Sequence, residues 1–401
     1  MKEGNAEMKD FLAKLNKKEK YMIGNQFFSF FIMGVYVIMI GSILPMMRED
    51  YGLSYEVSGF IVSIHNLGNM AGGLLAGLIA MLLTIKTSYI VFTVVAAVGF
   101  IATLLTKNPV FLLTAFAFTG IGRGVVNNYN NLTVSTIGEG KSAPNNMLHS
   151  CFSIGALLSP FIVLACTKNS AAGWKIAIGV VIVLLVVSLV MSFPMDLGRI
   201  EYDKGARKAD RSFRFLKDRK FMLPTLCMFF YQCVEATLMG WLVSYFIEGG
   251  YISEGFSQTL NSILWIAILV GRLTCVAIAN KIHSPQMVKY MSIGMLVFTI
   301  VMLFANSFAL AMISIVGLGI FASGMFGTIM ACAGDIFPEY TFSMSMFIAI
   351  AGAGASLWPA VIGLIAGAAG MKMGMNSVLI PAVLLVIAAF INCRFFTKKH
   401  Q

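Results

Sequence analysis

Twelve apolar stretches of about 20 residues or more follow one another along this chain, and they limit its possible folds more than any other feature. A helix needs about 20 apolar residues to cross the hydrocarbon core of a bilayer. Charged and turn-forming residues separate the stretches, which cover 22–46, 55–84, 87–106, 109–136, 145–167, 174–194, 221–247, 256–281, 285–306, 308–336, 342–369 and 374–395. Hydrophobic residues make up 58% of the chain and charged residues only 12%, which excludes a soluble globular domain. We therefore expect an all-α membrane protein with twelve transmembrane helices.

Lysine and arginine are distributed unevenly between the connections of these stretches. They are concentrated in residues 1–20, in the connection 195–220 and around the tail 396–401, whereas the alternate connections contain few. The positive-inside rule places such basic segments in the cytoplasm. We expect a multi-pass protein of the cell inner (plasma) membrane with both termini cytoplasmic. The net charge of +11 follows from this distribution and requires no nucleic-acid partner.

The polar connection 195–220 separates six apolar stretches from six others. Each half repeats a glycine-rich second stretch that is followed by a short basic turn, with Gly73, Gly77 and Lys86 in the first half and Gly271 and Lys281 in the second. Two six-helix halves of this kind fit a rocking-bundle transporter with its substrate near the membrane midplane. We expect a basic N-terminal segment at 1–20, pseudo-symmetric bundles at 21–194 and 221–395, a cytoplasmic linker at 195–220 and a tail at 396–401.

Three short motifs carry a resemblance to a known family. The segment Tyr231-Gln-Cys-Val-Glu235-Ala-Thr-Leu-Met-Gly-Trp241 resembles the seventh span of sugar:proton symporters of the major facilitator superfamily, the branch that includes fucose and glucose permeases. Gly271-Arg272 and Gly120-Ile-Gly122-Arg-Gly124 resemble its eighth and fourth spans. The resemblance implies a cavity lined by spans 1, 4, 7 and 10, alternating access and, in many members, proton coupling. Fucose-type members carry acids in spans 1 and 4, and this chain has none there.

Glu235 is an isolated carboxyl within the apolar stretch 221–247. Charged groups inside membranes are costly, and they usually mark the route of an ion or solute. A carboxyl removed from water can bind and release a proton near neutral pH. It could equally accept hydrogen bonds from solute hydroxyls, or remain permanently paired or neutral and hold spans together. We expect proton coupling or charge recognition at Glu235.

Arg123 lies near the middle of the fourth stretch, and its guanidinium cannot lose its charge. Helical steps place Asn127 and Asn130 on the same stripe, with Asn131 beside it. A planar cation beside amides suits a carboxylate, a phosphate or a ring of hydroxyls. We expect Arg123 and His65, like Glu235, to serve proton coupling or charge recognition. The alternative for Arg123 is an internal ion pair, for example with Glu235.

Other polar side chains on apolar stretches are candidates for lesser roles. His65 could shuttle protons or simply hydrogen-bond a neighbouring helix. A tryptophan offers a stacking surface for a sugar, although packing explains most single tryptophans. We expect substrate binding by Tyr36, Asn127, Asn130, Asn131, Gln232, Asn261, Trp265 and Trp358. Arg272 and Asp335 lie near the predicted cytoplasmic ends of two stretches, and we expect them to form a gate ion pair in one access state.

The sequence contains no Walker lysine motif, no HExxH and no GxSxG, and its seven cysteines show no metal-binding spacing. We therefore expect neither an enzyme nor a cofactor or metal. The favoured function is a monomeric secondary active transporter that moves a small polar solute, a sugar or sugar-like metabolite, by proton-coupled alternating access. The alternatives are an organic-anion carrier that uses Arg123, a drug-efflux antiporter, and a membrane sensor that has lost turnover.

Overall fold

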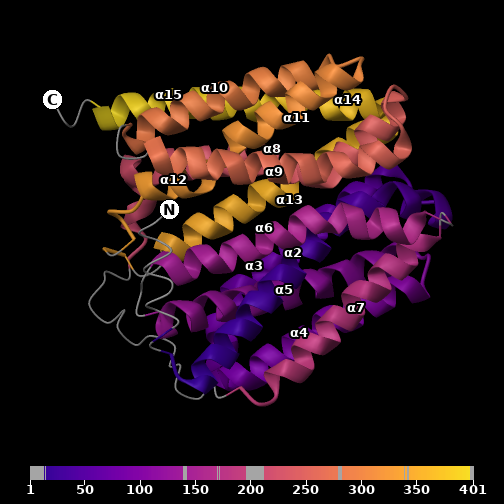
Figure 1. Ribbon diagram of the computed structural model, residues 1–401. Coiled ribbons are helices and arrows are strands. Elements are labelled where there is room, and N and C mark those ends of the chain that lie inside the picture. Colours follow the sequence, from indigo (N-terminus) through magenta and orange to yellow (C-terminus); the bar gives the residue numbers. More distant parts are fainter. Residues whose placement is uncertain are drawn as a thin grey trace. The chain divides into compact units, whose positions relative to one another are not determined.

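The computed structural model describes residues 13, 15–138, 142–168, 170, 172–195, 212–278, 282–337, 339–340 and 343–397. Nearly all of these residues are helical (Figure 1), and each predicted stretch corresponds to one helix or to two consecutive helices. Ten segments of the described chain are long and apolar enough to cross a membrane. The prediction of an all-α membrane protein is confirmed. Most of the predicted basic leader and linker falls outside the described residues, at 1–12, 14 and 196–211.

Contacts divide the chain into two units. The first comprises 1–40 and 64–204, and the second comprises 41–63 and 205–401. The helices that contribute to the first unit are α2 (Lys17–Tyr51), α3 (Tyr55–Leu82), α4 (Ile85–Leu105), α5 (Pro109–Ile137), α6 (Ser142–Thr167) and α7 (Gly173–Ser192). Within this unit, α4 packs along α5 and α7 (Figure 1). The predicted bundle boundaries at 194 and 221 stay a prediction.

Glycine brings α3 and α5 of the first unit into close contact. A Cβ atom added to Gly120 of α5 would overlap the backbone carbonyl oxygen of His65 on α3. Small residues are favoured at such helix crossings in membranes. The hydrophobic effect does not drive helices together in lipid, so close packing must hold them. The contact sets the side chain of His65 beside the face of α5 that carries Thr119 and Arg123.

The second unit contains most of the remaining helices. They are α8 (Arg219–Gly249), α9 (Glu254–Ile278), α10 (Ser284–Leu303), α11 (Phe308–Ala322), α12 (Met325–Cys332), α13 (Ser343–Ala369), α14 (Met371–Asn376) and α15 (Leu379–Thr397), with a short 3-10 turn, η3 (Arg214–Lys217), before α8. Helix α8 packs against α13 and α15, and α10 lies beside α11 and α15 (Figure 1). Helix α8 is therefore central to its unit, with 18 of its residues buried.

Two predicted stretches are each divided into two helices. The stretch 308–336 forms α11 and α12, with Ser323 and Gly324 between them. Glycine and serine are weaker helix formers than alanine or leucine, and a helix end leaves backbone carbonyls without their intrahelical donors. The stretch 374–395 forms the end of α14 and most of α15; Gly370, just before α14, has a φ of 85°, which glycine adopts without steric cost. The first of these breaks bears on the candidate site.

Residues 41–63, the end of α2 and the start of α3, group with the second unit. A Cβ atom on Gly41 would overlap the carbonyl oxygen of Met239 in α8, and one on Gly59 would crowd the carbonyl oxygen of Pro359 in α13. Such backbone approaches between helices require glycine. This grouping differs from the predicted division of the chain at its one long polar connection.

One hydrogen bond adds to this packing where proline interrupts the backbone ladder of α2. Pro45 cannot donate to the carbonyl of Gly41, and proline disturbs the helix locally. At the next carbonyl, that of Ser42, Gln258 Nε2 of α9 donates a hydrogen bond of 3.0 Å. A side chain of α9 therefore bonds the α2 backbone where proline weakens the helical ladder.

An ion pair also joins the segment 41–63 to α8. Arg48 Nη2 lies 2.8 Å from Glu248 Oε1, and the Tyr55 hydroxyl donates to Glu248 Oε2 at 2.7 Å. The Arg48 guanidinium also lies 4.0 Å from the centre of the Tyr55 ring. Because the Arg48 and Glu248 side chains are 22% and 28% exposed, we expect the pair to contribute no more than about 1 kcal/mol.

Candidate functional site

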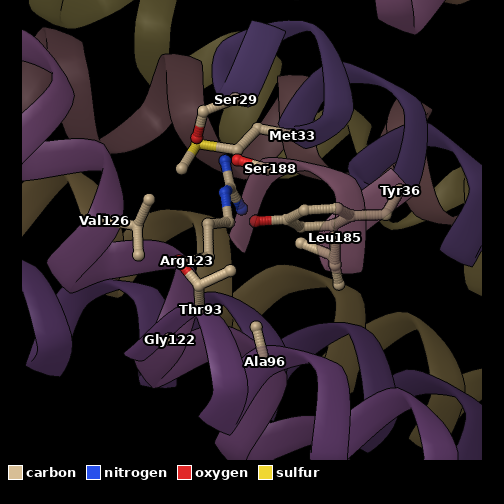
Figure 2. A pocket seen from close by; sticks show the side chains of 10 residues that line it. All are labelled: Ser29, Met33, Tyr36, Thr93, Ala96, Gly122, Arg123, Val126, Leu185 and Ser188. Carbon is tan, nitrogen blue, oxygen red and sulfur yellow. The ribbon is translucent and has the colours of Figure 1, made fainter. Parts of the chain in front are cut away.

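Arg123 lines a small cavity inside the first unit. Helices α2, α4, α5 and α7 supply the lining residues, which are Ser29, Met33, Tyr36, Thr93, Ala96, Gly122, Arg123, Val126, Leu185 and Ser188. Figure 2 shows the guanidinium in the middle of this group, with the Tyr36 hydroxyl directed toward it and the hydroxyls of Ser29 and Ser188 near its tip. The cavity therefore combines a fixed cation with several hydroxyl groups.

No carboxylate among the described residues pairs with Arg123. Its hydrogen-bonding neighbour is His65, whose Nε2 lies 3.4 Å from Arg123 Nη1. The Tyr36 ring packs edge-on against the His65 ring, with 6.2 Å between the centroids. Because a guanidinium keeps its charge, the described part of this cluster is positive.

The asparagines of α5 divide into two groups. Asn130 is fully buried and donates from Nδ2 to Ser29 Oγ at 3.0 Å, which connects it to the wall of the cavity. Asn131 instead donates to the backbone carbonyl of Asn127 at 2.8 Å, and neither of these two lines the cavity. Of the candidates predicted in this unit, the structure brings Tyr36, His65, Arg123 and Asn130 together. It leaves Asn127 and Asn131 outside this cluster, so substrate binding by them stays a prediction.

Glu235 belongs to a different cluster, in the second unit. One helical turn before it, the Tyr231 hydroxyl donates to Glu235 Oε1 at 2.6 Å. The same hydroxyl lies 3.3 Å from the carbonyl oxygen of Ala322, the last residue of α11. Glu235 is therefore connected through Tyr231 to the break between α11 and α12.

Arg272 contacts the same break. Its Nε donates to the carbonyl oxygen of Ser323 at 3.3 Å, and a cation is favourable at the carboxyl end of a helix. The predicted ion pair with Asp335 is not formed among the described residues of this structure, where Asp335 is exposed in the turn after α12. The helix end competes for the guanidinium, and this competition could not be predicted without the break in 308–336. A pair formed in another access state stays a prediction.

The remaining candidates are polar groups in the interior of the second unit. Asn261 and Trp265 lie one turn apart on α9 and are 1% and 3% exposed. Neither amide atom of Asn261 has a hydrogen-bond partner among the described residues, and the same holds for Trp358 Nε1 on α13. Gln232 is half-buried on α8. Their predicted contact with a solute stays a prediction.

Sequence reasoning missed three polar residues of the first cluster. Thr93 and Ser188 line the cavity, and Thr119 bonds His65. The signals were weak but present: Ser188 interrupts an apolar run, and Thr119 lies four residues before Arg123, on the same helix face. Among the described residues, no group of histidine, cysteine, aspartate and glutamate side chains could hold a metal ion.

Comparison with known proteins finds a family whose sequence profile matches this chain. A sequence profile described as Major Facilitator Superfamily matches residues 26–288. The glucose/mannose transporter GlcP of Bacillus subtilis (strain 168) is 21% identical over 367 residues, which cover 86% of this chain and 87% of that protein.

Solved structures of transporters share the fold over almost the whole chain. A bacterial homolog of the human lysosomal transporter Spinster has a TM-score of 0.79 at 12% identity and covers 96% of this chain and 98% of its own. The nucleoside transporter NupG has a TM-score of 0.74 at 14% identity, covering 95% and 100%. The fucose:proton symporter FucP of E. coli has a TM-score of 0.64 at 17% identity, covering 93% and 98%. At these identities the likeness concerns the fold alone.

Proposed function

Because the chain belongs to the Major Facilitator Superfamily and is a multi-pass secondary transporter rather than an enzyme, we propose that its solute is a small, hydroxyl-rich molecule of the sugar class. The observation that carries this proposal is Asn261. Its side chain is 1% exposed, and neither amide atom bonds another described residue. A buried polar group without a partner costs about 1–3 kcal/mol, so an amide in this state is suited to bonding solute hydroxyls.

The surroundings of Asn261 and the Arg123 cavity support the same class of solute. Trp265, one turn from Asn261, has an indole face on which a sugar ring can stack. The cavity around Arg123 presents N–H donors together with the hydroxyls of Ser29 and Tyr36. Sugar hydroxyls both donate and accept hydrogen bonds, so they suit the donors and hydroxyls of this cavity. The similarity to a glucose/mannose transporter makes glucose the first sugar to test.

An organic anion is the second candidate, and one observation favours it. Arg123 has no carboxylate partner among the described residues, so its charge is available to a carboxylate or phosphate. The Tyr36 and Ser188 hydroxyls could supply further bonds to such a group. Nothing comparable in the described structure favours a drug-efflux antiporter.

Uptake by proteoliposomes separates the two candidates. Glucose and glucuronate differ only in the group at carbon six, which is a hydroxymethyl in one and a carboxylate in the other. The proposal expects saturable uptake of glucose, or of a related neutral sugar in a panel with mannose, fucose and xylose, and no uptake of glucuronate. Uptake of glucuronate alone would favour the anion carrier, and no uptake of any of these solutes would contradict both.

A matched pair of substitutions tests the observation itself. Asn261→Ala removes the buried amide, whereas Asn306→Ala removes an exposed amide between α10 and α11. We expect Asn261→Ala to raise the KM for the transported sugar about tenfold, the equivalent of one or two hydrogen bonds, and Asn306→Ala to leave it unchanged. Equal values of KM in the two variants would remove Asn261 from the binding site.

We further propose proton coupling at Glu235, a plasma-membrane location with both termini cytoplasmic, and a monomeric unit. Coupling is supported by the position of Glu235 inside an apolar helix, and orientation by the positive-inside distribution of lysine and arginine. A pH-sensitive dye trapped in the proteoliposomes should report proton entry with the sugar. Labelling of terminal tags in intact and permeabilised cells tests the orientation, and light scattering of the purified protein tests the monomer.

A further inference from the structure

His65, Thr119 and Arg123 form a chain of hydrogen bonds inside the first unit. Arg123 Nη1 lies 3.4 Å from His65 Nε2, and His65 Nδ1 lies 2.9 Å from Thr119 Oγ1. The Thr119 hydroxyl in turn donates to the backbone carbonyl of Phe116 at 2.8 Å. His65 is 3% exposed, so water does not readily replace any of these partners.

We infer that His65 is fixed as the neutral tautomer with its proton on Nδ1, and that in this form it positions the guanidinium of Arg123. A hydroxyl has one proton, and that of Thr119 is directed to Phe116. Thr119 Oγ1 must therefore accept from His65, which places a proton on Nδ1. A guanidinium has donors only, so His65 Nε2 must accept from Arg123 and carries no proton.

The other forms of the ring conflict with this chain. A proton on Nε2 would direct an N–H against the N–H groups of Arg123, and an imidazolium would add a second positive charge in a buried space. The charged or titratable side chains that face His65 among the described residues are Arg123 from α5 and Tyr36 from α2, and neither is an acid that would stabilise an imidazolium. His65 is thus a positioning residue and not the proton carrier that the sequence allowed.

The orientation has a consequence for the cavity. A guanidinium has five N–H donors in a rigid plane, and the bond to His65 uses one of them. With that edge fixed, the remaining donors lie among Ser29, Ser188 and Tyr36 (Figure 2). The effect on solute binding rests on the proposed function, whereas the tautomer of His65 does not.

Nitrogen NMR of the full chain labelled with 15N-histidine tests the tautomer directly. The chain has four histidines, and His65→Gln identifies the signals of His65 by their loss. We expect a protonated Nδ1 and a bare Nε2, unchanged between about pH 5.5 and 8, the range in which an ordinary histidine gains its charge. A proton on Nε2, or a titration within this range, would overturn the inference.

Substitution of each partner shows whether these bonds are the cause. Thr119→Val removes the acceptor for Nδ1–H, so a mixture of tautomers should appear. Thr114→Val is the matched control, because Thr114 makes the same kind of bond to its own helix at an exposed position of α5. Arg123→Met removes the donor to Nε2 and should move that signal alone. An unchanged spectrum in both Thr119→Val and Arg123→Met would contradict the proposed bonds.

The positioning role has its own readout, which requires no solute. In protein labelled with 15N-arginine, a guanidinium held at one edge should show distinct Nη signals, and Arg123→Lys identifies them. His65→Asn keeps a donor near Thr119 but has no acceptor at the ring's far position, so the Arg123 signals should merge as the group rotates freely. His65→Gln can supply that acceptor and should restore two signals. Equal spectra for the two variants would overturn the positioning role.

Discussion

The two charged clusters differ in what surrounds the charge. Arg123, in the first unit, faces a neutral histidine and hydroxyl groups, and no described carboxylate balances it. Glu235, in the second unit, receives a hydrogen bond from Tyr231, whose hydroxyl also lies near the carbonyl oxygen of Ala322. A guanidinium cannot lose its charge, whereas a carboxyl can gain a proton. We therefore propose that the first cluster recognises the solute and that the second binds a coupling proton.

Tyr231 connects the protonation state of Glu235 to the break between α11 and α12. Its hydroxyl has one proton and two acceptors, Glu235 Oε1 at 2.6 Å and the carbonyl oxygen of Ala322 at 3.3 Å. An ionised Glu235 is the stronger acceptor, because charge-assisted hydrogen bonds are about twice as strong as neutral ones. Protonation of Glu235 would release the hydroxyl to Ala322, at the break between α11 and α12. We expect this exchange to couple proton binding to movement of that break.

The largest effect is expected from Glu235→Gln, which keeps the shape of the side chain but cannot bind and release a proton. Each pH unit across the membrane supports about tenfold accumulation when one proton enters with one solute, and this accumulation should disappear. Exchange of labelled for unlabelled solute should persist. The measurement is uptake by proteoliposomes with and without a pH gradient.

Glu339→Gln is the control for this variant, since Glu339 is an exposed carboxyl near the start of α13. It should accumulate solute like the unaltered protein. Uphill accumulation by Glu235→Gln would remove Glu235 as the proton site and end the distinction between the clusters.

Arg123→Lys should have the next largest effect. Lysine keeps the charge but not the planar donor edge, so the bond to His65 and the bonds to the solute cannot form together. We expect the KM of exchange to rise about tenfold or more, the equivalent of one charged hydrogen bond. Arg394→Lys, at an exposed position near the end of α15, should change nothing. A normal KM for Arg123→Lys would assign Arg123 to structure and not to recognition.

Tyr231→Phe sharpens the comparison within the second unit. The hydroxyl that connects Glu235 to Ala322 is removed, so accumulation should fall severalfold while exchange continues. Tyr245→Phe, also on α8, loses a bond to the carbonyl of Leu303 and serves as the control. If both variants accumulate equally well, Tyr231 does not transmit the state of Glu235.

The smallest effect concerns the ion pair between Arg48 and Glu248. Both side chains are partly exposed, so Glu248→Gln should destabilise the protein by about 0.5–1 kcal/mol. The measurement is thermal unfolding in detergent. The difference in stability from the unaltered protein should shrink in about 0.5 M salt, which screens the attraction between exposed charges. A salt-independent loss of several degrees would mean that the Tyr55 bond, and not the charge pair, holds the segment 41–63.

The helices themselves were largely predictable from local sequence. The stretch predicted at 87–106 forms α4 at Ile85–Leu105, with Thr84 as its N-cap, and the stretch at 109–136 forms α5 behind the cap Asn108 and Pro109. Length and apolarity decide where a chain crosses a membrane, and both are local properties. The break at Ser323 and Gly324 was missed because the stretch stays apolar on both sides of it.

The partners of the charged side chains were less predictable. The spacing of α5 put Asn130 and Arg123 on one stripe. Arg123 lines the cavity itself, and Asn130 is connected to it by a hydrogen bond to Ser29. The same spacing favoured Asn127, which instead bonds Asn131 within its own helix. For Arg272 the sequence offered Asp335, whereas the guanidinium bonds the end of α11. Periodicity assigns a face to a residue, but contacts between distant helices decide what it meets.

Exchange and uphill accumulation, measured on the same proteoliposomes for Glu235→Gln and Arg123→Lys, test the division of roles most directly. We predict that Glu235→Gln exchanges solute normally and accumulates none, and that Arg123→Lys is impaired in both. Loss of exchange and accumulation in the same proportion by the two variants would contradict this division, because the clusters would then share a single role.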